Sequence, residues 1–232
     1  MLFVDANIAD AVCCSLTYDN WIATEEPPIP AAFLSSGVAF LVAVAFLFAA
    51  EGPGSADVLT TLDSERGRLL FEGTVAAGIV AVVLYVVAAS WLFLRLRAVN
   101  ELGMLIVLAL SIVVAPVTIA FLAFQYVPVA VAQEHQSTSD PAFRQLVVSA
   151  HAFADVGGWA VIALLAISVL IVSAVLWQAR RWRSLAAGGF ALFALALLLF
   201  VLDSSYLFLL PFGLWEITIA VLLISGRSWR DT

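Results

Sequence analysis

Residues 160–177 read AVIALLAISVLIVSAVLW and contain no charged side chain. A bilayer core needs about 20 mostly apolar residues in one helix, so this run and its flanks have the composition and length of a transmembrane span. The residues before it, SAHAFADVGGW (149–159), place His151 and Asp155 one helical turn apart. The apolar run decides the fold, and the two ionisable residues beside it raise the question of function.

Five other apolar runs accompany this one. The chain is 64% hydrophobic and 12% charged, whereas a soluble domain carries about 25% charged residues. We therefore predict an all-α fold, a polytopic transmembrane bundle of six helices over residues 31–232, preceded by a short acidic interfacial segment over residues 1–30. The predicted spans cover residues 31–50, 70–94, 103–131, 146–177, 185–202 and 206–225.

The arginines predict the orientation of the bundle, because positive residues near span ends stay on the cytoplasmic side. All ten basic residues are arginine, and seven of them follow the second, fourth and sixth spans. Both termini are therefore predicted to be cytoplasmic, in a multi-pass protein of a prokaryotic cell membrane. The seven are Arg95, Arg97, Arg180, Arg181, Arg183, Arg227 and Arg230.

Several functional classes lack their sequence features here. No basic patch exists for nucleic acid, no lysine for a retinal Schiff base and no CxxCH for covalent haem. The two cysteines, Cys13 and Cys14, are adjacent, so they imply neither a disulfide framework nor a zinc site. The sequence names no cofactor. The expected partners are the lipid bilayer and either other membrane subunits or further copies of the chain.

Six polar residues within or at the edges of the spans are the candidates for a ligand or ion site. An Asp at a helix centre costs about 2.5–3.5 kcal/mol on insertion scales, so such residues usually face the bundle interior and have a partner. With the predicted orientation all six lie in the outer half of the membrane. They are Glu72, Gln125, His151, Asp155, Asp203 and Glu216.

His151 and Asp155 share a helix face at spacing i, i+4, and the neighbouring glycines 157 and 158 would let another helix approach. We expect this face to look toward Glu216 or Glu72. Such a cluster either fixes helix register or binds a small ligand, a proton or a metal. A metal, if any, would use His151, Asp155 and Glu216, although no HExxH signature is present.

The second half of the chain resembles an uncharacterised family of prokaryotic six-span membrane proteins. The resemblance rests on LLPFGLWEITIAVLLISGR (209–227), on SAHAFADVGGW with the later WQARRWRS, and on LYVVAASWLFLRLRAVNELGMLIVLAL (84–110). It covers about residues 70–228. The chain lacks the proline that usually follows the fourth span, and its N-terminal part finds no counterpart. The resemblance implies a six-helix fold and no particular activity.

Three functions stay open at this point. The leading prediction is an integral membrane protein without a catalytic signature that binds a partner or small ligand, for example as an accessory subunit of a membrane complex. The first alternative is a small transporter or proton carrier that uses the outer-half His, Asp and Glu residues. The second is an intramembrane metal-dependent enzyme, which would need those groups to converge around a reacting atom.

Overall fold

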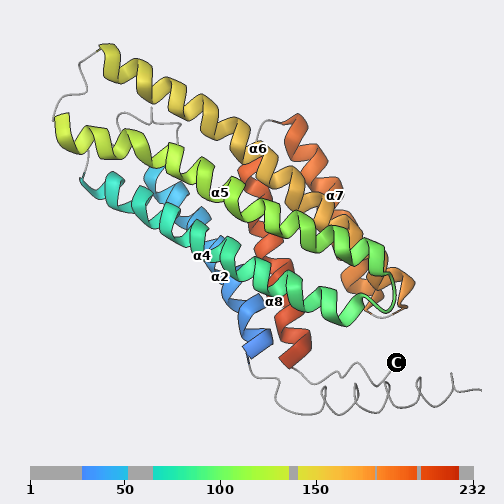
Figure 1. Ribbon diagram of the computed structural model, residues 1–232. Coiled ribbons are helices and arrows are strands. Elements are labelled where there is room, and N and C mark those ends of the chain that lie inside the picture. Colours follow the sequence, from blue (N-terminus) through green and yellow to red (C-terminus); the bar gives the residue numbers. More distant parts are fainter. Residues whose placement is uncertain (1–27, 52–64, 136–140, 181, 203–204, 225–232) are drawn as a thin grey trace, which may run out of the picture.

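The computed structural model describes residues 28–51, 65–135, 141–180, 182–202 and 205–224, and these residues are helical apart from short turns. Because the apolar runs are long and continuous, they satisfy their backbone hydrogen bonds within single helices. The elements, labelled as in Figure 1, are α2 (Pro28–Glu51), α4 (Glu65–Leu96), α5 (Glu101–His135), α6 (Pro141–Gln178), α7 (Arg183–Val201), the short 3-10 helix η1 (Ser205–Phe208) and α8 (Leu209–Ile224).

Five of these helices are long and apolar enough to cross a membrane, and α8 is a shorter apolar helix of 16 residues. The predicted all-α membrane bundle is therefore confirmed, with five to six spans. Large apolar side chains such as Val80 and Val156 are more than half exposed on its outer surface, where they contact lipid. Residues 1–27, 52–64 and 136–140 lie outside the described residues. The interfacial segment and the orientation thus stay predictions.

The helices follow one another around the bundle in chain order (Figure 1). Each helix packs against the next one, and α8 closes the ring by packing against α2 and, more sparingly, against α7. The first turn of α2 and the last turn of α8 lie at the same end of the bundle (Figure 1). One face of every helix therefore points into a single core, and this arrangement brings residues from distant parts of the sequence together.

Two short turns lie at the same end of the bundle, one between α4 and α5 and one between α6 and α7. The side-chain oxygen of Asn100 accepts a hydrogen bond of 2.8 Å from the backbone N–H of Gly103, which caps the start of α5. The Asn100 amide nitrogen donates to the Gln178 side chain at 3.2 Å, which ties this turn to the end of α6. Arg180 and Trp182 adopt left-handed backbone angles in the turn that leads into α7.

The contact between α6 and α7 depends on Gly189. A Cβ atom at this position would overlap the Ser173 hydroxyl, which donates a 2.7 Å hydrogen bond to the Val169 carbonyl. We expect Gly189→Ala to lower the free energy of unfolding by about 1–3 kcal/mol, the usual cost of an overpacked core. Thermal unfolding in detergent, followed by tryptophan fluorescence, measures this change.

The matched test of this contact is the double variant Gly189→Ala with Ser173→Ala. Because the second substitution removes the overlapping oxygen, the double variant should recover part of the loss, with a coupling of about 1 kcal/mol. Additive effects of the two substitutions would contradict the proposed contact.

Candidate functional site

The centre of the site is the crossing of α2 and α8, where two glycines let the backbones meet. A Cβ atom at Gly37 would lie 2.6 Å from the Gly213 carbonyl oxygen, and one at Gly213 would lie 2.8 Å from the Gly37 carbonyl oxygen. No side chain fits between these two carbonyls, so the helices touch through their main chains. This close approach places two nearby residues, Ser36 on α2 and Glu216 on α8, within hydrogen-bonding distance.

Glu216 is a carboxyl group inside the bundle core, and it is only 1% exposed. Its Oε2 atom lies 2.8 Å from the Ser36 hydroxyl, and the same hydroxyl lies 3.2 Å from the backbone oxygen of Ala81 on α4. The other carboxyl oxygen, Oε1, is buried and has no hydrogen-bond partner among the residues that the structure describes. One serine hydroxyl thus joins three helices, and one oxygen of the acid is left unpaired.

The hydrogen-bond geometry around Ser36 fits a protonated Glu216. A serine hydroxyl has one proton, so it cannot donate fully to both Glu216 and the Ala81 carbonyl. If Glu216 carries a proton on Oε2, it donates to Ser36, and Ser36 donates to Ala81, so both bonds are made. An ionised Glu216 would accept the hydrogen bond of the Ser36 hydroxyl and leave the Ala81 carbonyl without a donor. It would also bury an uncompensated charge, which costs several kcal/mol or more.

A second set of hydroxyl groups lies beside Glu216. The Tyr85 hydroxyl on α4 is within hydrogen-bonding reach of Ser168 on α6 and Ser111 on α5, and Glu216 is close enough to interact with it electrostatically. Each serine also donates to its own helix, Ser111 to a carbonyl at 2.8 Å and Ser168 to one at 2.9 Å. Their oxygens remain as acceptors for Tyr85. Five helices each contribute one polar side chain, and we call these five residues the polar centre: Ser36, Tyr85, Ser111, Ser168 and Glu216.

The polar centre lies at one level of the bundle. Tyr85 precedes the end of α4 by about three helical turns, Ser111 follows the start of α5 by about the same length, and Ser168 precedes the end of α6 equally. At 1.5 Å per residue, all three lie about 15 Å from the same end of the bundle. A hydrocarbon core is about 30 Å thick, so this level would be near the midplane of a bilayer whose core began at this end of the helices.

Aromatic rings cover the polar centre on the side toward the start of α8. The ring of Phe212 lies 5.2 Å from that of Phe40, 5.7 Å from that of Tyr85 and 5.7 Å from that of Phe208, measured between centroids. On the other side, the rings of Phe33 and Trp91 meet at 5.9 Å. The site is therefore closed toward both ends of the bundle.

Trp215 fixes α8 against α7. Its indole nitrogen donates to the Leu185 carbonyl at 3.3 Å, and its ring lies over Gly189. The residue beside it, Glu216, points in another direction, toward α2. One turn of α8 is therefore held on two sides, which fixes the direction of the Glu216 side chain.

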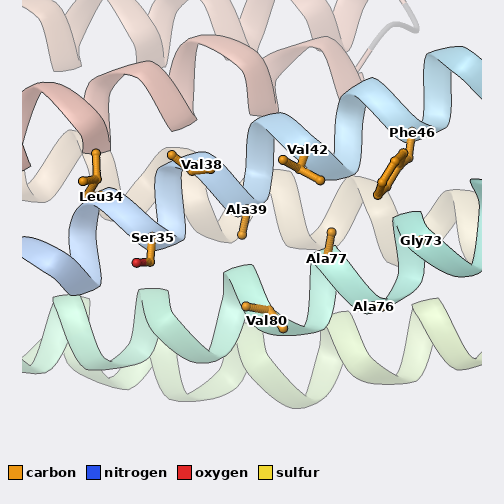
Figure 2. Close-up of a pocket in the computed structure, with 10 residues that line it drawn as sticks. All are labelled: Leu34, Ser35, Val38, Ala39, Val42, Phe46, Gly73, Ala76, Ala77 and Val80. Atoms are coloured by element: carbon orange, nitrogen blue, oxygen red, sulfur yellow. The ribbon is translucent and has the colours of Figure 1, made fainter.

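An apolar groove lies on the lipid side of this site, between α2 and α4 (Figure 2). Its volume is about 570 Å³, and its lining is almost wholly apolar. Ser35 is the polar side chain among its lining residues, and Ser36 and Ala81 lie behind it in the interface between the two helices. The lining residues are Leu34, Ser35, Val38, Ala39, Val42, Phe46, Gly73, Ala76, Ala77 and Val80.

Of the six residues predicted from the sequence, Glu72, Gln125 and Asp155 have their backbones close to one level, and Glu216 lies at another. Glu216 lies in the polar centre, whereas Glu72 is half-buried on α4, about 20 Å before Tyr85 along the helix. Asp155 likewise lies about 20 Å before Ser168 on α6, and His151 lies one turn farther away. The backbone of Gln125 belongs to α5, about 20 Å beyond Ser111.

The side chains of Gln125, His151 and Asp155, and the whole of Asp203, lie outside the described residues. Their binding roles, including the metal set of His151, Asp155 and Glu216, therefore stay predictions. Within the part of the chain that the structure describes, no group of three or more His, Cys, Asp or Glu side chains could hold a metal ion.

Four members of the polar centre were not predicted from the sequence: Ser36, Tyr85, Ser111 and Ser168. Serine is common in membrane helices, where its hydroxyl usually bonds to the carbonyl four residues earlier, as Ser111 and Ser168 do here. The signal that could have found them is their spacing along the helix relative to other core residues. Ser111 belongs to a buried stripe of α5 at helical spacing, together with Val107, Val114 and Thr118.

No protein-family model matches the chain, and no curated protein and no solved structure matches it either. The resemblance to an uncharacterised six-span family thus remains one of sequence pattern. The function has to be argued from the polar centre alone.

Proposed function

We propose that this chain is a small proton carrier of a prokaryotic plasma membrane, in which Glu216 binds and releases one proton at the polar centre. The observation that carries the proposal is the Ser36 hydroxyl placed between Glu216 and the Ala81 carbonyl, at 2.8 and 3.2 Å. This arrangement suits a protonated acid. A second state, with Glu216 ionised, would require the surrounding helices to rearrange or to admit water.

The unpaired Oε1 atom favours a carrier over a purely structural network. Leaving a buried polar atom without a partner costs about 1–3 kcal/mol, and an apolar side chain of similar size would avoid this cost. Ionisable groups within membrane helices are rare and costly, and they mark proton relays and substrate pathways. A residue that only fixes helix register would gain nothing from the unpaired oxygen.

The other two functions have less support. The apolar outer faces suit lipid, so they do not require an additional protein subunit. A metal-dependent enzyme would need several ligands at one level, whereas the polar centre offers a single carboxyl group together with hydroxyl groups. A proton needs only one acid and acceptors for its hydrogen bond.

The test is infrared spectroscopy of the purified protein in nanodiscs, before and after transfer to D₂O. The wild type should show the carbonyl stretch of a protonated carboxylic acid, and deuterium should shift this band well before the membrane-helix amides exchange. Rapid exchange is expected of a carrier, because its acid must communicate with bulk water in the folded protein. The carboxyl proton of a purely structural acid would exchange as slowly as those amides, because both reach water only when the bundle opens.

Three variants identify the residue that gives this band. Glu216→Gln should abolish it, the matched control Glu72→Gln should leave it unchanged, and Ser36→Ala should shift its frequency by removing the acceptor. If the band persists in Glu216→Gln, or exchanges no faster than the membrane-helix amides, Glu216 is not a proton carrier.

A further inference from the structure

Phe212 lies one helical turn from Glu216 on α8, on the side toward the start of that helix. Its ring is fully buried, and its neighbours come from three other elements: Phe40 on α2, Tyr85 on α4 and Phe208 on η1. The rings of Phe40 and Phe212 meet nearly edge to face, at 85°. Phe212 therefore forms the middle of an aromatic layer that separates Glu216 from this end of the bundle.

The route from Glu216 to the start of α8 is short. Glu216 lies about two turns, or about 10 Å, along the helix from Leu209, the first residue of α8. Phe212 and Glu216 are four residues apart on α8, so the Phe212 ring lies on the same side of the helix as the acid, and the Phe208 ring packs against it from η1. The Phe212 side chain is therefore part of the barrier on this route.

The route toward the opposite end is closed by residues of several helices. Beyond the pair of Phe33 and Trp91, the core continues with Leu96 on α4, Met104 on α5 and Leu176 on α6, each at most 1% exposed. These three residues come from three helices whose ends are tied by Asn100 and Gln178, and they fill the interior down to the turns. Opening this end would separate several helices. The side of the α8 start is also packed, with Val82, Val114 and Leu165 each at most 1% exposed, but there the Phe212 ring lies between Glu216 and the first residue of α8.

We propose that Phe212 is the gate of the proton site, and that the proton reaches Glu216 from the end of the bundle at which α8 begins. The inference rests on the proposed function of Glu216 and adds the side from which the site is reached. Phe212 acts through its position and exchanges no proton itself, so it is a positioning residue. An alanine at 212 would leave space for water beside the acid.

The experiment measures chemical modification of Glu216 from each side of the membrane. A water-soluble carbodiimide (EDC) activates a carboxylic acid, and taurine, which is charged and does not cross membranes, then forms an amide that mass spectrometry locates. Sealed vesicles of both orientations receive these reagents. In Phe212→Ala, Glu216 should react about tenfold faster than in the wild type, a change of about 1.4 kcal/mol in the barrier, and only from the side of the α8 start.

Phe33→Ala is the matched control. It removes the same ring from a similarly buried position, 2% exposed, on the opposite side of Glu216. It should give no acceleration from the side of the α8 start. Equal acceleration in both variants, or acceleration from both sides in Phe212→Ala, would show general loosening of the bundle and would overturn the gate. If Phe212→Ala does not fold, Phe212→Leu replaces it, with a smaller acceleration expected from the same side.

The two proposals fail in different ways. If infrared spectroscopy finds no exchangeable proton on Glu216, the proposed function fails whatever the modification rates. If the proton exchanges but Phe212→Ala and Phe212→Leu react like the wild type, Glu216 remains the proton site, and only the assignment of Phe212 is wrong.

Discussion

Replacing Gly37 by alanine is expected to lower the free energy of unfolding by about 3 kcal/mol, in the upper part of the range for overpacked cores. The new Cβ atom would lie 2.6 Å from the Gly213 carbonyl oxygen and 2.8 Å from a side-chain carbon of Ile217. A backbone oxygen cannot rotate away, so α2 and α8 would have to separate. The separation would also lengthen the contact between Ser36 and Glu216, so the infrared band of the acid should change together with the stability.

Gly158→Ala is the matched control for this substitution. Gly158 also lies in the middle of a helix, but no atom lies within 4 Å of the place where its Cβ would stand. The control should be neutral or slightly stabilising, since alanine favours helix over glycine by about 1 kcal/mol. Thermal unfolding of both variants in detergent compares the two positions. Equal effects would contradict the close contact between α2 and α8.

Replacing Glu216 by methionine is expected to abolish proton binding while leaving the fold as stable as the wild type, or more stable by about 1 kcal/mol. Methionine is unbranched and of similar length, so it can fill the same space. It removes a buried oxygen that has no partner, and it leaves the Ser36 hydroxyl free to donate to the Ala81 carbonyl. Function would then be lost without loss of stability, as at sites where activity opposes stability.

Unfolding measurements and infrared spectra of the same Glu216→Met preparation test this expectation. Destabilisation by about 2 kcal/mol or more, the size of a broken buried polar interaction, would show that the carboxyl group supports the structure and would count against the carrier. Glu216→Lys is the informative contrast. It places a positive charge at the same buried position and should prevent stable folding. This result would show that the position accepts only a neutral side chain of similar size.

The helical membrane architecture follows from the sequence because hydrophobic length is a property of each run by itself. The turn at Asn100 can also be predicted from the sequence, because this residue lies between two apolar runs. The helix boundaries are predicted less exactly: α4 begins five residues before the predicted residue 70, α6 begins five residues before the predicted residue 146, and the start of the last span also differs. The sequence predicts that this span begins at residue 206, but η1 occupies residues 205–208 and the α-helix begins at Leu209.

The candidate site was predictable only at Glu216, whose burial follows from the cost of a carboxyl group in lipid. Its partner, Ser36, resembles every other serine in an apolar run. The sequence does not show that Ser36 bonds to other helices, because that depends on the crossing at Gly37 and Gly213. The expected cluster with Glu72 rests on depth in the membrane, and depth alone does not determine which residues meet.

The order of the helices around the ring has a consequence for how the protein is made. Ser36 and Glu216 are 180 residues apart, and α8 closes the ring against α2 as the last of these helices to be synthesised. During synthesis, α2 lies in the bilayer with a hydroxyl group already directed to its neighbour α4. The acid enters the membrane only when its acceptor is already in place. The proton site therefore forms at the last step of insertion, and a chain that stops after α7 would lack it altogether.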